Sequence, residues 1–273
     1  MDAETREMKH ADEASATFGM REITTSGTQF ILNGRPLFLR GTLECCIFPL
    51  TGYPPTDVEG WRHVIRRCQE YGLNHIRFHS HCPPEAAFEA ADELGFYFQV
   101  EGPFWCTVGN GEPIDRYVYE EWDRILRVYG NHPSFLLMAY GNEPSGPGRG
   151  AKLLGPWVEH YKRKDPRRLV TCASGWPYIP ENQYHVMHSP LRLHGRLEQN
   201  PLQTTFDYAE GVEKYPVPLV SHESGQWCVF PNLDEIPKYT GVLKPLNFEI
   251  VRDFLEQHGL LHQARDFLMA SGR

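Results

Sequence analysis

The sequence predicts an α/β protein, a (β/α)8 TIM barrel that is incomplete, with about seven βα units recognisable from the apolar periodicity. Short apolar runs alternate with amphipathic segments of helical period, which indicates a parallel sheet with helices outside it. Polar and charged residues follow nearly every strand at its C-terminal end, and a barrel gathers those ends into one mouth. A doubly wound sheet is disfavoured, because the first strand leads into Arg40-Gly41-Thr42 without a glycine-rich phosphate turn.

The strands are expected at regular intervals from residue 30 onward. Phe30-Ile31-Leu32 leads into Asn33-Gly34, a hairpin-type turn, and residues 37–41 are expected to form the next strand, which stops at glycine. Further strands are expected at residues 75–80, 96–101, 135–140, 169–173, 184–188 and 219–222. We therefore expect residues 1–29 to be an N-terminal tail or the remnant of a preceding β domain. Residues 30–273 are expected to be the barrel, truncated before its last strand.

The helices are marked by caps and by glycines. Thr56-Asp57 is expected to cap a helix from residue 58 to about 71, in which Trp61 and Ile65 recur at helical spacing and which Gly72 ends. The same reasoning predicts helices at residues 85–94, 115–129, 151–164, 205–214 and 247–270.

Composition narrows the class of partner. A net charge of −8 does not favour nucleic acid or an anionic membrane surface. No run reaches the roughly 18 apolar residues that a membrane span needs, and the polar N-terminus is unlike a signal peptide. We expect the chain as written to be cytoplasmic, while a full-length parent is open to export. The seven cysteines include no CxxC pair and are interpreted as buried thiols of a reduced protein.

Two carboxylates stand at corresponding places in two strand ends. Glu143 follows the strand at 135–140 and comes directly after Asn142, whereas Glu223 follows the strand at 219–222. A pair of carboxylates facing one bond suits acid/base and nucleophilic chemistry, and a retaining glycosidase needs them roughly 5–5.5 Å apart. Each glutamate alone is as consistent with an ordinary cap or loop carboxylate. Their pairing at two strand ends favours catalysis, with Asn142 bonded to a sugar hydroxyl beside the reacting carbon.

Three tryptophans follow strand ends and are candidate platforms for a sugar ring: Trp105, Trp176 and Trp227. Aromatic faces stack on the apolar face of a pyranose, although each of the three is about as consistent with simple packing. The other tryptophans, Trp61, Trp122 and Trp157, fall within predicted helices and are interpreted as core.

Four stretches of the sequence match a known family: FGMRE at residues 18–22, FILNGRPLFLRG at 30–41, GNEP at 141–144 and HES at 222–224. On these residues the chain resembles the catalytic barrel of glycoside hydrolase family 2, over roughly residues 18 to 230. The resemblance implies a retaining, exo-acting glycosidase that needs no cofactor and takes a carbohydrate substrate. It implies that Glu143 is the acid/base and Glu223 the nucleophile.

The same resemblance implies further substrate contacts. Arg77 and His79 match the strand-two residues that line the sugar site, and Glu101 is counted with them as a strand-end residue. Arg77 is expected to orient His79 or a catalytic carboxylate rather than to select an acidic sugar. Where family members carry a tyrosine after the sixth strand, this sequence offers His188. The family's eighth-strand tryptophan has no counterpart.

Two other functions are open at this point. His79 and His81 form an HxH pair that, with His185 or His188 and Glu223, would suit a metal-dependent barrel hydrolase. That reading lacks an aspartate after the last strand and a lysine suited to carbamylation. The second is a non-catalytic carbohydrate-binding barrel fragment. The presence of both carboxylates argues against activity lost by substitution, but not against activity lost by truncation.

Overall fold

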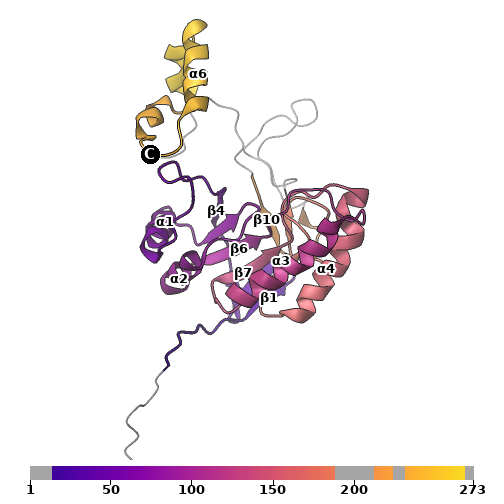
Figure 1. Cartoon of the computed structure of the whole chain (residues 1–273). Coiled ribbons are helices and arrows are strands. Elements are labelled where there is room, and N and C mark those ends of the chain that lie inside the picture. The colour runs from indigo at the N-terminus through magenta and orange to yellow at the C-terminus, as the bar shows by residue number, and fades with distance from the viewer. Residues whose placement is uncertain (1–13, 188–211, 224–230, 268–273) are drawn as a thin grey trace, which may run out of the picture.

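The computed structural model describes residues 14–187, 212–223 and 231–267, and seven parallel strands follow one another in it around a partial barrel (Figure 1). Five strands pair in chain order to form one sheet, and the last two form a parallel pair. An isolated bridge between Ser174 and Val186 continues the wall from the larger sheet to the smaller one. The strands are β4 (Gly41–Glu44), β5 (His75–Phe78), β6 (Tyr97–Glu101), β7 (Phe135–Ala139), β8 (Leu169–Thr171), β9 (His185–Met187) and β10 (Leu219–Ser221).

The barrel is open on one side. Among the described residues, no strand pairs with the outer edge of β4 or with that of β10. A cavity of about 850 Å³ lies along this gap, which we call the seam. Residues of β4, β5 and β10 line it, together with residues 28–30 and 36–39. The alternating strands and helices confirm the predicted fold class, a (β/α) barrel that is not closed.

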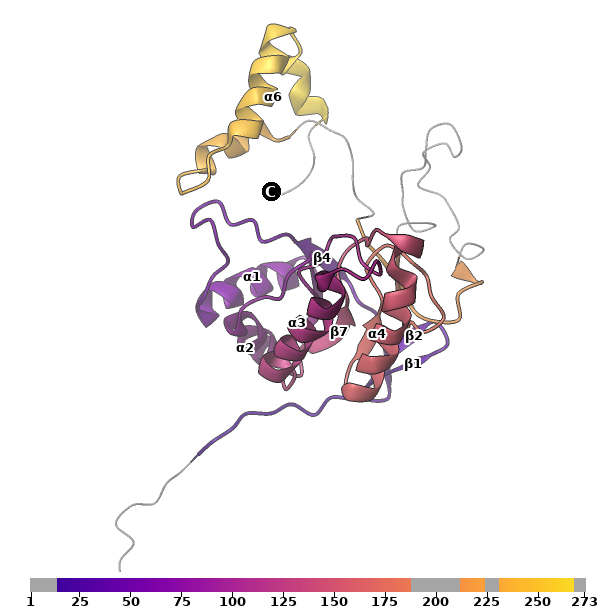
Figure 2. The same ribbon diagram turned by 45° about the vertical axis from the view of Figure 1, so that its right-hand side comes forward.

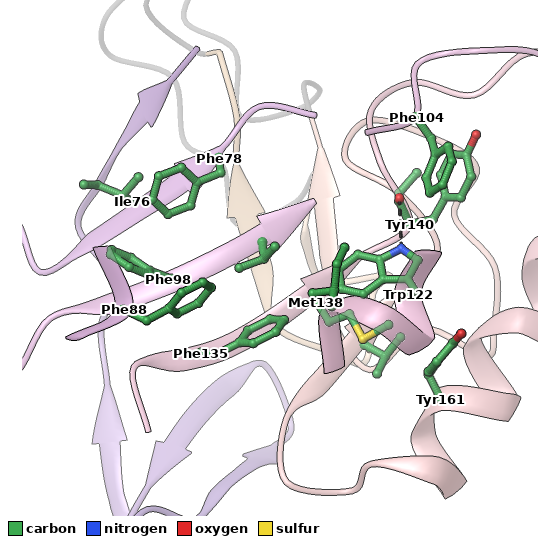
Figure 3. Close-up of a cluster of buried hydrophobic side chains, with 14 of the residues drawn as sticks. Ile76, Phe78, Phe88, Phe98, Phe104, Trp122, Phe135, Met138, Tyr140 and Tyr161 are labelled. Atoms are coloured by element: carbon green, nitrogen blue, oxygen red, sulfur yellow. Dashed lines mark hydrogen bonds between the residues drawn. The ribbon is translucent and has the colours of Figure 1, made fainter. Parts of the chain in front are cut away.

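Four helices cover the outside of the sheet: α1 (Val58–Glu70), α2 (Glu85–Leu94), α3 (Pro113–Tyr129) and α4 (Ala151–Lys164), seen together in Figures 1 and 2. The Asp57 side chain accepts a hydrogen bond of 2.8 Å from the Gly60 amide, so the expected cap of α1 is present. The helices bury aromatic side chains against the strands (Figure 3). In that layer Trp122 donates from its indole nitrogen to the Tyr140 carbonyl at 3.3 Å, which joins α3 to the end of β7.

An antiparallel meander packs against the amino-terminal end of the barrel. It consists of β1 (Ile23–Ser26), β2 (Gln29–Leu32) and β3 (Arg35–Leu37). Its turn has positive φ at Asn33 (49°) and Gly34 (75°), which is the backbone that an Asn-Gly hairpin turn requires, so the predicted turn is confirmed. Arg21 donates to the carbonyls of Pro133 and Phe135 and attaches the meander to the start of β7. The meander spans residue 30, where we expected the barrel to begin.

The strand expected at residues 37–41 is wrong in its placement. β3 ends at Leu37 and β4 begins at Gly41, so the expected strand falls on the connection between them. The apolar run that suggested a strand is not buried there, because Phe38 is 76% exposed.

The C-terminal residues form short helices beside the loop that follows β4 (Figures 1 and 2). The amides of Val242 and Leu243 donate to carbonyls of that loop, at 3.1 and 3.0 Å. The single helix expected at 247–270 is divided, because Gly259 has a left-handed φ of 69°. The elements here are η2 (Leu233–Lys238), α6 (Leu246–Gln257) and η3 (Leu261–Phe267), where η marks a 3-10 helix. The helix expected at 205–214 lies mostly outside the described residues.

Two expectations from composition, on membrane spans and on cysteines, are compared with the described residues. No helix within them combines the length and apolar character needed to cross a membrane. The six cysteines that the described ranges contain are free thiols, but among them only Cys172 is buried and Cys45 and Cys46 are exposed, so the expected burial is wrong for most of them. Cys228 lies outside the described ranges.

Candidate active site

Glu143 and Glu223 follow β7 and β10 and occupy unusual backbone conformations. Their φ angles are 37° and 54°, in the left-handed region that side chains other than glycine, asparagine and aspartate rarely adopt. Such a residue persists only where the surrounding structure holds it, and these residues gather at functional sites. Both carboxylates that the strand-end pattern selected are thus among the six described non-glycine residues with positive φ.

Close contacts from β8 fix Glu143. Its amide donates to the Ser174 carbonyl at 2.8 Å, and the Asn142 amide donates to the Phe104 carbonyl at 2.9 Å. A Cβ atom placed on Gly175 would lie 2.9 Å from Glu143 Cγ and 3.7 Å from His222 Nε2. The ends of β7, β8 and β10 thus converge on one point, and only glycine leaves space for the Glu143 side chain there.

Arg77 joins the two carboxylate-bearing strand ends. It lies on β5, is only 5% exposed, and donates from Nη2 to Asn142 Oδ1 at 2.7 Å. Its Nη1 lies 3.4 Å from Glu223 Oε1, and its Nε lies 2.5 Å from Glu101 Oε1. Burial alone would lower the pKa of Arg77, but Glu101 and Glu223 outweigh it and raise that pKa. A permanent positive charge is therefore held between Asn142 and Glu223.

Glu101 has no exposed surface. Besides Arg77, it accepts hydrogen bonds from the Ser80 amide at 2.9 Å, from Gln99 Nε2 at 3.3 Å and from the Ser174 hydroxyl. Sequence reasoning counted Glu101 with the substrate contacts. In the structure its carboxylate is occupied by protein donors, so it contacts Arg77 and not open solvent.

Gln99 and Ser174 were not among the expected site residues. Gln99 lies two residues before the end of β6 and Ser174 three residues after the end of β8, where an amide or a small side chain resembles an ordinary packing residue. The available signal was that Gln99 is a polar residue inside an otherwise apolar strand, and such a residue needs a buried partner.

The remaining expected substrate contacts lie around this centre. His79 Nε2 is 3.8 Å from Glu223 Oε1, and the His79 ring meets Trp105 edge to face at 5.3 Å. Trp105 is 62% exposed, so a large part of its surface is open to a ligand. Trp176 is half-buried and donates from its indole nitrogen to the Pro144 carbonyl at 3.1 Å. Two other expected residues, His188 and Trp227, lie outside the described residues.

The histidines do not converge as a metal site would require. His79 faces Glu223, whereas His81 Nε2 lies 3.0 Å from Glu44 Oε2, so the HxH pair contacts two different carboxylates. His185 packs against aromatic rings, and burial lowers its pKa to about 4. Within the described ranges, no three histidine, cysteine or acidic side chains are grouped to bind a metal ion. This geometry does not favour the metal-dependent hydrolase.

Comparison with known proteins agrees with the resemblance. Residues 23–229 match the family described as glycosyl hydrolases family 2, TIM barrel domain. The β-glucuronidase of Rattus norvegicus is 25% identical over 227 residues, covering 76% of this chain and 34% of the relative. The β-galactosidase large subunit of Latilactobacillus sakei is 28% identical over 190 residues, covering 61% of this chain and 29% of that protein.

A solved structure has the same fold. The family 2 β-galacturonidase from Eisenbergiella tayi, crystallised with galacturonate, superposes with a TM-score of 0.58 at 20% identity, over 74% of this chain and 38% of that one. The chain spans about a third of the length of the curated relatives that it matches. With the family match covering most of its residues, together with the partial barrel, the chain belongs to glycosyl hydrolase family 2, as a TIM barrel domain of that family.

Proposed function

We propose that this barrel hydrolyses a terminal O-glycosidic bond with retention of configuration, with Glu143 as the acid/base and Glu223 as the nucleophile. The observation that carries the proposal is the Arg77 bridge. One buried guanidinium contacts Glu223 and also Asn142, the neighbour of Glu143, at 3.4 and 2.7 Å. This bridge supports a site in which two carboxyl groups act on one bond.

The proposed reaction has two displacements. In the first, a Glu223 oxygen attacks the anomeric carbon, the bond to the leaving oxygen breaks, and the Glu143 proton passes to that oxygen. In the second, Glu143 removes a proton from water, the water oxygen attacks the same carbon, and Glu223 leaves as a carboxylate. Asn142 is placed to bond the hydroxyl beside the reacting carbon.

The electrostatics of Glu223 suit the nucleophile. A nucleophilic carboxylate has to be ionised, and Arg77 is a cation 3.4 Å from its oxygen. His222 Nδ1 lies 3.5 Å from the same oxygen, and His79 Nε2 lies 3.8 Å from it. The Arg77 contact holds one Glu223 oxygen in place before any substrate arrives, which reduces the reorganisation that attack requires.

The named relatives suggest the sugar. They are β-glucuronidases and a β-galactosidase, so we propose a terminal β-linked uronide or galactoside as the substrate class. Exo action is likewise part of the proposal.

The test assays nitrophenyl β-D-glucuronide and β-D-galactoside with the wild type, Glu143→Gln and Glu223→Gln. We expect each substitution to lower kcat/KM roughly 100-fold or more, in the range that acid/base and nucleophilic groups contribute. Glu256→Gln, on the exposed surface of α6, is the matched control and should retain wild-type activity. Wild-type turnover that survives both active-site substitutions refutes the assignment, and sugar binding without turnover indicates a non-catalytic barrel.

The two roles are separated by the leaving group. A dinitrophenolate leaves without a proton, so Glu143→Gln should retain far more activity on a dinitrophenyl glycoside than on a phenyl glycoside. Glu223→Gln should lose activity on both. NMR of the anomer first released checks the stereochemistry, and inversion would contradict a retaining mechanism.

A further inference from the structure

Arg149 lies over the indole of Trp176, on the side of the site that Glu143 occupies. Its guanidinium carbon is 4.6 Å from the ring centroid, within the range of a cation–π contact. The indole is itself attached to the Glu143 loop, because Trp176 Nε1 donates to the carbonyl of Pro144, the residue that follows Glu143.

The backbone under Arg149 is unusual. Gly148 and Arg149 have consecutive left-handed φ angles of 58° and 53°, and the Arg149 amide donates to the Gly146 carbonyl at 2.9 Å. The left-handed region disfavours arginine, so this tight turn holds the side chain in place at a local cost in free energy. An arginine side chain that rotated freely on an ordinary loop would not be held over the indole in this way.

The charge of Arg149 is available to a ligand. The side chain is exposed, and within the described ranges no carboxylate forms an ion pair with it. The pKa of Tyr178 is sensitive to the charge of Arg149. Burial raises the pKa of Tyr178 to about 12, with Arg149 opposing the rise and Glu143 adding to it. One exposed cation and the acid/base candidate therefore act on the same hydroxyl.

We propose that Arg149 and Trp176 form a leaving-group subsite that selects an aglycone or sugar bearing a carboxylate. The inference rests on the proposed function, since the group that protonates the leaving oxygen must face the leaving group. Trp176 holds the Arg149 guanidinium beside the Glu143 loop through the cation–π contact, and Arg149 carries a fork of N–H donors that matches a planar carboxylate. The nucleophile lies on the other side, with Arg77 and His79.

The experiment measures binding with hydrolysis-resistant probes. The probes are 4-carboxyphenyl 1-thio-β-D-glucuronide and 4-carboxyphenyl 1-thio-β-D-galactoside. Each is compared with the ester in which the carboxyl group of the phenyl ring is methylated. All are titrated calorimetrically into the wild type, Arg149→Gln and Arg149→Lys. We expect the wild type to prefer each acid over its ester, and Arg149→Gln to lose roughly ten-fold of that preference, as for a charged hydrogen bond. Arg149→Lys should keep part of it, and added salt should weaken it. Arg116→Gln, an exposed arginine on α3, is the control and should bind as the wild type does.

Equal preference in the wild type and Arg149→Gln overturns the inference, and so does the absence of wild-type binding. The ratio between acid and ester cancels any general loss of folding, because a damaged variant loses both probes together. Binding does not depend on turnover, so the two proposals fail separately. A preference that depends on Arg149, found without hydrolysis, supports the subsite and contradicts the proposed glycosidase activity. Hydrolysis that Glu143→Gln abolishes, found without such a preference, contradicts the subsite alone.

Discussion

At the scale of single residues, Arg77 organises the site. It starts on β5 and contacts Glu101 at the end of β6, Asn142 after β7 and Glu223 after β10. Its partner Glu101 is fully buried, so neither charge is screened by solvent. Removing one member of such a pair leaves an uncompensated buried charge, which costs more than the intact pair contributes.

Arg77→Gln should therefore affect both stability and activity. We expect unfolding free energy to fall by roughly 3–5 kcal/mol, as for a broken buried ion pair. We also expect kcat/KM to fall about 100-fold or more, since small misplacements of reacting groups have effects of that size. Urea unfolding and the nitrophenyl assay measure the two. The double variant Arg77→Met/Glu101→Leu should recover stability without activity, and recovered activity would contradict a positioning role. Arg62→Gln, a surface arginine paired with Glu59 and Glu93, should be neutral.

His75 predicts a pH dependence of stability. Burial lowers its pKa from 6.5 to about 4, so the folded protein holds a neutral ring while the unfolded chain binds a proton near pH 6.5. The stabilisation is complete above pH 6.5 and is lost as the pH falls toward 4. Urea unfolding between pH 7.5 and 4.5 should show this loss, and His75→Gln should reduce its slope. His185 shifts in the same direction, so part of the slope should remain. An unchanged slope in His75→Gln contradicts the assignment.

Residue types at strand ends were readable in the sequence, but their partners were not. Asn142-Glu143 and His222-Glu223 stand after apolar strands, and that local pattern identified them. The contacts of Arg77 with Asn142 and Glu223 join residues 65 and 146 positions apart, so they depend on the barrel's curvature. From the sequence, Arg77 was expected to orient His79 or a catalytic carboxylate, and in the structure its Nη1 lies 3.4 Å from Glu223 Oε1.

At the scale of elements, glycines decide how closely strand ends approach. A Cβ on Gly141 would lie 2.1 Å from the Phe104 carbonyl oxygen, which belongs to the backbone and has no simple way to move aside. Gly155 is different, because it lies inside α4 and its Cβ would lie 3.2 Å from Glu181 Oε1, the far end of a flexible side chain. An added Cβ therefore clashes with fixed backbone at Gly141, whereas at Gly155 it meets a side chain that can move.

Gly141→Ala and Gly155→Ala should act in opposite directions. We expect the first to lower unfolding free energy by roughly 1–3 kcal/mol, as overpacking does, and to displace Asn142 and Glu143 enough to reduce turnover. The second should raise it by up to about 1 kcal/mol through helix propensity, with activity unchanged. Thermal or urea unfolding with the nitrophenyl assay compares them. Destabilisation of similar size in both would show that the space around each glycine is not what decides the effect.

Element type was predicted better than element position. The β5, β6, β7 and β8 strands were expected within a few residues because they are buried runs bounded by glycine or polar residues. β4 was misplaced because the apolar residues 37–39 belong to the end of β3 and the connection after it, while the true strand, Gly41–Glu44, contains a single large apolar residue. Edge strands are harder to recognise, because only part of each is covered by the core.

At the scale of the whole molecule, the seam leaves two strand edges that no strand of the described ranges pairs with. The interior strands β6 and β7 are bonded on both sides and packed between helices and meander, whereas β4 and β10 each have one described neighbour. Opening free energies follow such differences in contacts and pairing. The carboxylate site borders the seam, since Arg77, His222 and Glu223 all line the cavity there.

Hydrogen exchange should report this asymmetry. We expect amides of β6 and β7 to exchange slowest, and those of β4 and β10 to exchange at least about 100-fold faster, because pairing on one side alone permits local opening. Mass-spectrometric exchange on residues 1–273 resolves the four segments. Equal protection of β4 and β7 would contradict an open seam and would indicate that another segment covers the edge.

The left-handed backbone at the two carboxylates has an evolutionary consequence. Folding stability alone favours glycine or asparagine where φ is 37° or 54°, since neither suffers the steric penalty of a glutamate there. A lineage that no longer depends on the reaction gains stability by such replacements and accumulates them. If the two residues act as proposed, glutamate at both 143 and 223 reflects selection for reactivity against selection for stability. Family members that have lost activity should have lost these two residues before they lose the core beneath them.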